Sequence, residues 1–305
     1  MRGRSSLIVA AFWLPLIAAG AQRSVLPAWV CSEPDAVFVA GFETGEAPVP
    51  HQASGGSGGL YAGDISRQVS VAGLGTQTYY LHIPLHYKPN HPWPLVVALH
   101  GAGGPNTSDV YARTVRSDWG GVGEAGGFLV IAPVGTDSTG GGWIEPGAGG
   151  EGPSDYDIVA AAIADTEAAY NVDLDRVYLW GYSAGGEVTY DIALTGWSGM
   201  NANTFAGIAV TGAALAGCPS YTVAASCVPA NAARTIPLDI HMGTADPRLP
   251  YAVSDENTFL AHGWTSGDTL FFTEFTDGNP PGGHLYTTAD LHDVWTNICP
   301  NAVVP

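Results

Sequence analysis

Ser183 lies in a stretch whose residue types are typical of a catalytic nucleophile. Residues 181–186 read Gly-Tyr-Ser-Ala-Gly-Gly and lie between a predicted strand, Val177–Trp180, and a predicted helix, Ala184–Leu194. A G-x-S-x-G turn between a strand and a helix exposes the serine hydroxyl above the edge of a sheet. Glycines are needed on both sides because side chains would collide across so sharp a turn. We therefore predict that Ser183 is a nucleophile, and a purely structural turn is the alternative.

A second stretch resembles the first in its letters. Gly196-Trp197-Ser198-Gly199-Met200 has methionine where the second glycine would stand, and it follows a predicted helix instead of a strand. We interpret it as a loop that ends the helix, so Ser198 is not predicted to react.

Glycines also follow the apolar run Leu95–Leu99, in the sequence His-Gly-Ala-Gly-Gly of residues 100–104. Such a loop lets backbone N–H groups approach a substrate oxygen, and a helix N-terminus supplies a second donor. We predict an oxyanion hole formed by the amides of Ala102 and Ala184, with Gly103 as the alternative to Ala102. A plain glycine-rich turn is also possible. A phosphate-binding loop is disfavoured because no G-K-[ST] follows.

The expected order of a triad on such a fold is serine, then an acid, then histidine. Asp246 follows the predicted strand Leu238–Met242, at the end where loops of an α/β sheet meet. It is therefore the predicted acid, which would hold the imidazole tautomer and stabilise the imidazolium. Asp255 and Glu256 are weaker alternatives because they lie further along the chain.

Two histidines compete for the role of general base. His284 ends a loop that begins after the predicted strand Leu270–Phe275, whereas His292 lies within the predicted terminal helix Leu285–Ile298. A base needs a position from which it reaches the serine. We predict His284 and keep His292 as the alternative.

The elements needed to position these residues alternate between strand and helix, which predicts an α/β fold with a mostly parallel sheet covered on both faces. An antiparallel hairpin, Ile65–Val71 and Thr78–Ile83, is expected at its start. The other predicted elements are the strands Phe128–Ala132 and Ile208–Val210 and the helix Asp157–Tyr170.

The charge balance excludes some partners. The 305 residues include 10 Lys+Arg and 28 Asp+Glu, a formal net charge of −18, and Lys88 is the only lysine. Nucleic-acid binding and polybasic membrane anchoring both need bases that this chain lacks. An acidic surface also repels anionic substrates, so neutral esters are the expected class of substrate for a serine triad here.

The N-terminus is typical of a secretory signal. Arg2 and Arg4 precede the apolar run Leu7–Ala19, and residues 19–21 (Ala-Gly-Ala) form a small-x-small cleavage site. We expect residues 1–21 to be removed on export to the extracellular space or periplasm. Residues 22–62 are interpreted as an N-terminal extension that ends in a flexible Gly/Ser linker, and residues 63–305 as the catalytic domain.

Four cysteines remain after the signal segment, and an even number in an exported chain predicts two disulfides. Cys218 and Cys227 bracket a short loop, so we pair them and leave Cys31 with Cys299; free buried cysteines are the alternative. No metal is expected, because the cysteines lack zinc-type spacing and the remaining histidines have no fixed spacing either.

Four motifs in order resemble the polyhydroxybutyrate depolymerase and feruloyl esterase branch of the α/β-hydrolases. They are Thr78–Gly104, GYSAGG at 181–186, HMGTAD at 241–246 and GGH at 282–284. The resemblance implies an α/β-hydrolase fold, an extracellular carboxylic-ester hydrolase without cofactor, and a triad of Ser183, Asp246 and His284.

The substrate is less constrained. Tyr182, beside the nucleophile, and Trp143 are the candidates for substrate binding. Feruloyl or acetyl esters of polysaccharide are expected, a polyhydroxyalkanoate or aromatic polyester is the alternative, and the protein is expected to be a monomer. A catalytically inactive module that binds a polymer is the alternative from another class.

Overall fold

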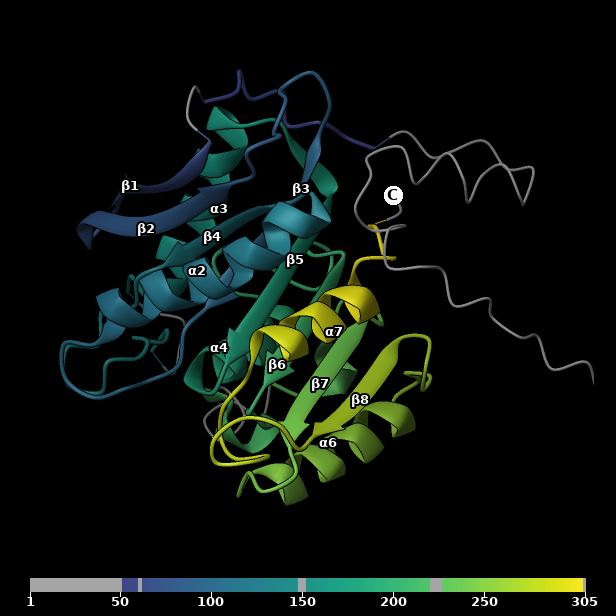
Figure 1. Cartoon of the computed structure of the whole chain (residues 1–305). Helices are drawn as coiled ribbons and strands as arrows, with labels where there is room; N and C mark the ends of the chain where they lie inside the picture. Colours follow the sequence, from purple (N-terminus) through teal and green to yellow (C-terminus); the bar gives the residue numbers. More distant parts are fainter. Residues whose placement is uncertain (1–50, 60–61, 148–151, 220–226, 304–305) are drawn as a thin grey trace, which may run out of the picture.

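The computed structural model describes residues 51–59, 62–147, 152–219 and 227–303 (Figure 1). Eight strands in these ranges form one sheet. The strands are β1 (Gly63–Val71), β2 (Gly75–Ile83), β3 (Trp93–Leu99), β4 (Leu129–Pro133), β5 (Val172–Tyr182), β6 (Gly207–Thr211), β7 (Leu238–Gly243) and β8 (Leu270–Phe275).

The order across the sheet is β1-β2-β4-β3-β5-β6-β7-β8. β1 and β2 form an antiparallel hairpin, β2 pairs antiparallel with β4, and every further neighbouring pair is parallel. The prediction of a mostly parallel sheet with an N-terminal antiparallel hairpin is therefore confirmed. Because parallel strands run in one direction, the loops after β3, β5 and β7 all emerge at the same edge.

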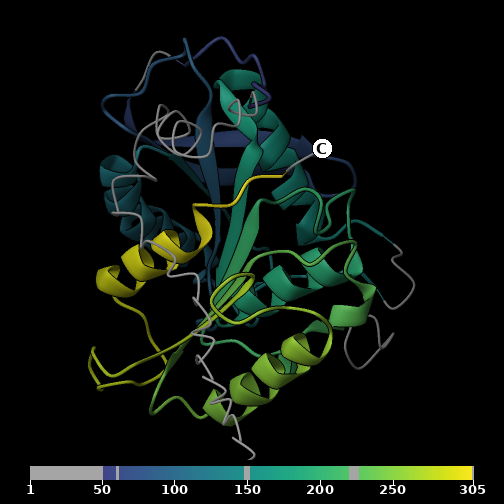
Figure 2. The ribbon, with the colours of Figure 1, turned by 90° about the vertical axis from the view of Figure 1, so that its right-hand side faces the viewer.

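Helices cover both faces, as Figure 2 shows with the sheet seen nearly edge-on. They are α2 (Ser108–Gly126), α3 (Asp155–Ala169), α4 (Ala184–Thr195), α6 (Leu249–Ala261) and α7 (Thr288–Ile298), with short 3₁₀ turns η2 (Leu215–Gly217) and η3 (Pro229–Asn231). α2 and α7 share one apolar core, and α3, α4 and α6 bury their side chains in another. Both faces are thus closed to solvent, which explains why β3 is buried at every residue.

Helix α2 has no counterpart among the sequence predictions, because glycines interrupt its apolar pattern. They serve close packing: a Cβ on Gly123 would lie 2.8 Å from the carbonyl oxygen of Phe128, and one on Gly120 would lie 3.1 Å from the ring of His82. The helix can approach β2 and the start of β4 only where side chains are missing.

Residues 51–59 differ from the expected flexible linker. The Ser54 amide donates to the Val172 carbonyl, and the Leu174 amide donates to the Gln52 carbonyl. A Cβ on Gly56 would lie 2.3 Å from the carbonyl oxygen of Tyr170. Glycine here permits contact with the start of β5, so composition alone misjudged this segment. The proposed signal segment and the rest of the extension, residues 1–50, lie outside the described residues.

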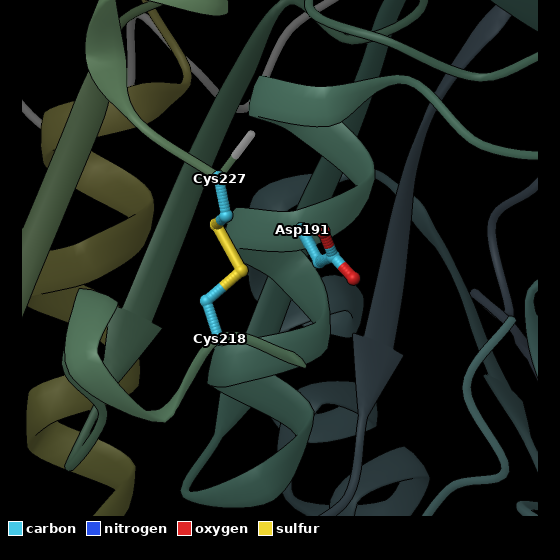
Figure 3. A group of neighbouring side chains, drawn as sticks. All are labelled: Asp191, Cys218 and Cys227. Carbon is cyan, nitrogen blue, oxygen red and sulfur yellow. A yellow bond between two sulfur atoms is a disulfide. The ribbon is translucent and has the colours of Figure 1, made fainter. Parts of the chain in front are cut away.

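Cys218 and Cys227 form the predicted disulfide. It lies beside Asp191 of α4, as Figure 3 shows. The predicted pairing of Cys31 with Cys299 involves a residue outside the described ranges and stays a prediction. Among the helices that the structure describes, none combines the length and apolarity needed to cross a membrane.

Candidate active site

Ser183 occupies a strained turn between β5 and α4. Its backbone has φ 53° and ψ −120°, a left-handed φ that serine rarely adopts. The turn is possible because its glycines lie against backbone: a Cβ on Gly185 would approach the Leu99 carbonyl oxygen to 2.3 Å. The Ser183 amide donates to the carbonyl of Thr211. The nucleophile predicted from sequence is thus fixed by β3, β5 and β6 together.

Ser183, His284 and Asp246 form one hydrogen-bonded chain. His284 Nε2 lies 2.9 Å from Ser183 Oγ, and His284 Nδ1 lies 2.6 Å from Asp246 Oδ2. An ionised carboxylate only accepts, so the ring proton lies on Nδ1 and Nε2 accepts from the serine hydroxyl. Asp246 is almost fully buried, whereas the His284 side chain is 29% exposed. This is the geometry of a general base directed at a nucleophile.

The loop that carries His284 is tied to its neighbours. The Tyr182 hydroxyl donates to the His284 carbonyl at 2.8 Å, and the two rings stack at 5.2 Å. The Ala245 amide donates to the Gly282 carbonyl, which joins the Asp246 loop to the His284 loop. Tyr182, which is predicted to bind substrate, therefore helps to fix the position of His284. Burial raises the pKa of its hydroxyl to about 12, so it remains a donor.

Gly212 leaves space for the base. A Cβ there would lie 2.9 Å from Cε1 of His284, and its φ of +64° already favours glycine. The residue follows β6 directly, at the edge of the sheet where the loops meet. This position carried no recognisable sequence signal.

Within the described residues, the backbone amides of Ala102 and Ala184 donate to no other residue, which leaves them available to a ligand. A Cβ placed on Gly142 would lie 3.2 Å from the Ala102 methyl carbon and 4.0 Å from that of Ala184. The two alanines therefore flank one point beside Ser183. N–H donors beside a nucleophile stabilise an oxyanion when they point at its oxygen, so the oxyanion role of the two amides stays a prediction.

Trp143 packs against the predicted oxyanion loop, residues 100–104. It is 5% exposed, stacks on His100 at 4.6 Å, and donates its indole N–H to the His100 carbonyl at 2.8 Å. His100 Nε2 accepts from the Gly135 amide, and burial lowers the pKa of His100 to about 4. Most of the Trp143 side chain is thus covered by protein, and its role in binding substrate stays a prediction.

Sequence reasoning missed Tyr111, which covers the oxyanion loop. Its side chain is 40% exposed. A Cβ on Gly103 would lie 1.8 Å from the Tyr111 ring, so the ring rests on that glycine. Tyr111 belongs to the first turn of α2, the helix that the sequence pattern hid. An exposed aromatic ring here offers a flat apolar contact to a substrate.

Arg248 is the second residue that was missed. Its Nη1 lies 3.4 Å from His284 Nε2, and its Nε lies 3.8 Å from Oε1 of Glu187. Burial raises the pKa of the Glu187 carboxyl to about 7, although Arg248 opposes that shift. A possible signal was present: a rare base only two residues after the predicted triad acid.

The alternatives to the triad members lie elsewhere. Asp255 is buried and accepts a hydrogen bond from the Leu215 amide at 2.8 Å, not from His284. Burial raises the pKa of Asp255 to about 7. Glu256 lies in α6 and His292 is exposed on α7. None of these three alternatives, Asp255, Glu256 and His292, belongs to the hydrogen-bonded chain of Ser183, His284 and Asp246.

Two groups of side chains within the described residues have donor atoms close enough to hold a metal. In one of them the sulfur atoms of Cys218 and Cys227 are bonded to each other and are not thiolate ligands. The other contains His51, Asp173 and Asp175, but Asp173 already pairs with Arg176 at 2.6 Å. Neither group touches Ser183.

No protein-family model matches the chain. A relative named probable feruloyl esterase C, from Aspergillus clavatus, is 29% identical over 150 residues, which cover 48% of this chain and 50% of that protein. The chain thus aligns with about half the length of this relative.

Solved structures with a similar fold include esterases and a peptidase. An acetyl xylan esterase from Aspergillus awamori superposes with a TM-score of 0.54 at 19% identity, covering 77% of this chain and 99% of that one. A ferulic acid esterase gives 0.56 at 14% identity, covering 78% and 96%. Porphyromonas gingivalis dipeptidyl peptidase 4 gives 0.54 at 16%, covering 78% and 35%. The chain therefore has the α/β-hydrolase fold that its motifs predicted.

Proposed function

We propose that the protein is a serine hydrolase of carboxylic esters. The observation that carries the proposal is the hydrogen-bonded chain from Asp246 through His284 to Ser183 Oγ, with the serine on a strained strand-to-helix turn. The two unengaged amides of Ala102 and Ala184 beside it supply what an acyl transfer needs. The similarity to esterases favours an ester over a peptide bond as the bond that is cleaved.

The mechanism follows from the geometry. His284 Nε2 takes the proton of Ser183 Oγ while Oγ attacks the ester carbonyl, and the Ala102 and Ala184 amides bind the oxyanion that develops. Asp246 stabilises the imidazolium, which then gives its proton to the leaving alcohol. Water activated by His284 hydrolyses the acyl-enzyme and restores the serine.

A pair of serine variants tests the reaction. Ser183→Ala is expected to lower kcat/KM for p-nitrophenyl acetate by at least about 10⁴-fold, because the nucleophile is lost. Ser198→Ala is the matched control, since Ser198 lies in an exposed turn of similar sequence and is expected to stay within about twofold of wild type. A fluorophosphonate probe should label wild type and Ser198→Ala but not Ser183→Ala. Unlabelled wild type without hydrolysis would favour a polymer-binding module instead.

For substrate, we propose esters of the feruloyl or acetyl kind, with a polyhydroxyalkanoate or aromatic polyester as the alternative. The exposed ring of Tyr111, which lies on Gly103, favours an ester substrate whose acid part carries a flat apolar group. The formal charge of −18 supports uncharged polymers over polyanions. Rates on methyl ferulate, an oligohydroxybutyrate and a neutral terephthalate diester, measured side by side, decide among these classes.

We also propose that the protein acts outside the cytoplasm, as the signal-like residues 1–21 and the Cys218–Cys227 disulfide suggest. Mass spectrometry of the protein recovered from culture medium or periplasm tests this. A mature N-terminus at Gln22 is the expected result, and recovery of the uncleaved chain from the cytosol would contradict it.

A further inference from the structure

We propose that Arg248 determines specificity: its guanidinium binds a carboxylate that a substrate carries a few carbon atoms from the ester carbonyl. The inference rests on the proposed ester hydrolysis and adds a substrate class to it. Arg248 lies directly before α6, two residues after Asp246, so the loop that supplies the triad acid also supplies this cation.

Arg248 lies within reach of an ester bound at Ser183. Arg248 Nη1 and Ser183 Oγ both lie near the same nitrogen, His284 Nε2, at 3.4 and 2.9 Å. An ester bound at Ser183 Oγ is therefore within one short carbon chain of the guanidinium. The backbone amide of Arg248 donates to Asp246 Oδ1 at 2.8 Å, which fixes where the side chain starts.

The Arg248 guanidinium has donors available to a ligand. A neutral imidazole nitrogen has one lone pair, and the shorter bond from Ser183 Oγ uses it. The 3.4 Å contact therefore leaves the guanidinium poorly satisfied. Among the described residues, the carboxylate that pairs with the guanidinium is that of Glu187, at 3.8 Å, which is beyond hydrogen-bond distance. The Arg248 side chain is 38% exposed, so a ligand reaches it.

The net charge of the protein and the charge of Arg248 act on a substrate carboxylate over different distances. The net charge of −18 disfavours anions over the whole surface, but solvent ions screen such long-range repulsion beyond roughly 8–10 Å. A guanidinium in direct contact with a carboxylate acts at shorter range and forms paired hydrogen bonds. The site is thus expected to accept one class of anion, an ester with a carboxylate near its carbonyl, on a protein that otherwise favours neutral substrates.

The test compares half-esters with neutral diesters of the same acid. kcat/KM is measured for monomethyl and dimethyl succinate and for monomethyl and dimethyl glutarate, and the ratio of half-ester to diester is the readout. Arg248→Gln is expected to lower this ratio by about tenfold or more, and Arg248→Lys is expected to retain part of it. Glu187→Gln is expected to raise the ratio, because it removes the competing carboxylate.

The matched control is Lys88→Gln. It changes the net charge by the same amount, but Lys88 is exposed in the loop that enters β3, at the edge of the sheet opposite Ser183. Its ratio is expected to stay within about twofold of wild type, as the screening of distant charges requires. A merely structural role of Arg248 would lower the rates on both esters together and leave the ratio unchanged.

The outcomes separate the two proposals. If the wild-type protein hydrolyses the diesters and Arg248→Gln leaves the ratio of half-ester to diester unchanged, the inference is overturned and the proposed function stands. An equal fall of the ratio in Lys88→Gln and Arg248→Gln also overturns it, since net charge would then be the cause. A wild-type protein that hydrolyses no ester and takes up no fluorophosphonate overturns both.

Discussion

Ser183 and Ser198 have nearly the same φ angle and different surroundings. Their φ angles are 53° and 52°, and each has glycines within two positions on both sides. Ser183 Oγ contacts His284 Nε2 at 2.9 Å, whereas Ser198 Oγ donates to Asp157 Oδ1 at 2.7 Å. An imidazole is a better general base for a serine hydroxyl than a carboxylate is. The turn exposes a serine, and the neighbouring base makes it reactive.

Asp246, which contacts His284, and Asp157, which accepts from Ser198, give the largest expected difference in rate when each is replaced by asparagine. Asp246→Asn should lower kcat for p-nitrophenyl acetate by about 10³- to 10⁴-fold, because His284 loses the acceptor that holds its tautomer. Asp157→Asn should leave the rate within about twofold. It should lower the free energy of unfolding by about 1 kcal/mol or less, because Asp157 Oδ2 caps the Ser154 amide at the start of α3. Steady-state rates and urea unfolding measure both effects, and equal rate losses would contradict the comparison.

The glycines of the two turns differ in what surrounds them. Gly185→Ala should lower the free energy of unfolding by about 3 kcal/mol or more, because its Cβ would lie 2.3 Å from the backbone oxygen of Leu99. Gly199→Ala should lower the free energy of unfolding by only about 1 kcal/mol. Its φ of +80° disfavours alanine, but nothing lies within 4 Å of an added Cβ. Urea unfolding midpoints decide the matter. Similar losses in both variants would mean that the turn at Gly185 shifts to accommodate the methyl group, so that close packing is not the main constraint there.

The smallest expected effect concerns charge next to Ser183. Glu187 lies in the first turn of α4, and burial raises its pKa to about 7 while Arg248 lowers it and Glu145 raises it further. Glu187 is therefore largely protonated below pH 7 and ionised above it, when it neutralises Arg248. The half-ester to diester ratio should fall about two- to fivefold as pH rises from 6 to 8.

The Glu187→Gln variant is the control for that pH dependence. Its ratio should be flat over the same range, because glutamine does not titrate. A ratio that falls equally in the variant would assign the pH dependence to another group. Because Lys88 is remote from this site, Lys88→Gln should show the same fall as wild type.

Local sequence predicted the strands well, since short apolar runs such as those of β3 and β4 occur where both faces of a sheet are covered. It failed for α2, where Gly120 and Gly123 serve contacts with β2 and the start of β4 instead of breaking the helix. It failed also for residues 51–59, whose glycines allow contact with Tyr170. In both cases glycine was needed for close approach, which composition does not distinguish from flexibility.

The sequence by itself determined an α/β fold with a mostly parallel sheet, because hydrophobic periodicity is a local property. The α/β-hydrolase fold was implied by the resemblance of its four motifs to that family. The sequence also singled out Ser183, Asp246 and His284, which lie in loops following predicted strands. Only the tertiary structure decided that these three side chains meet, and that Tyr182 and Arg248 contact His284. Contacts between residues up to 102 positions apart depend on strand order and register, which no local pattern encodes.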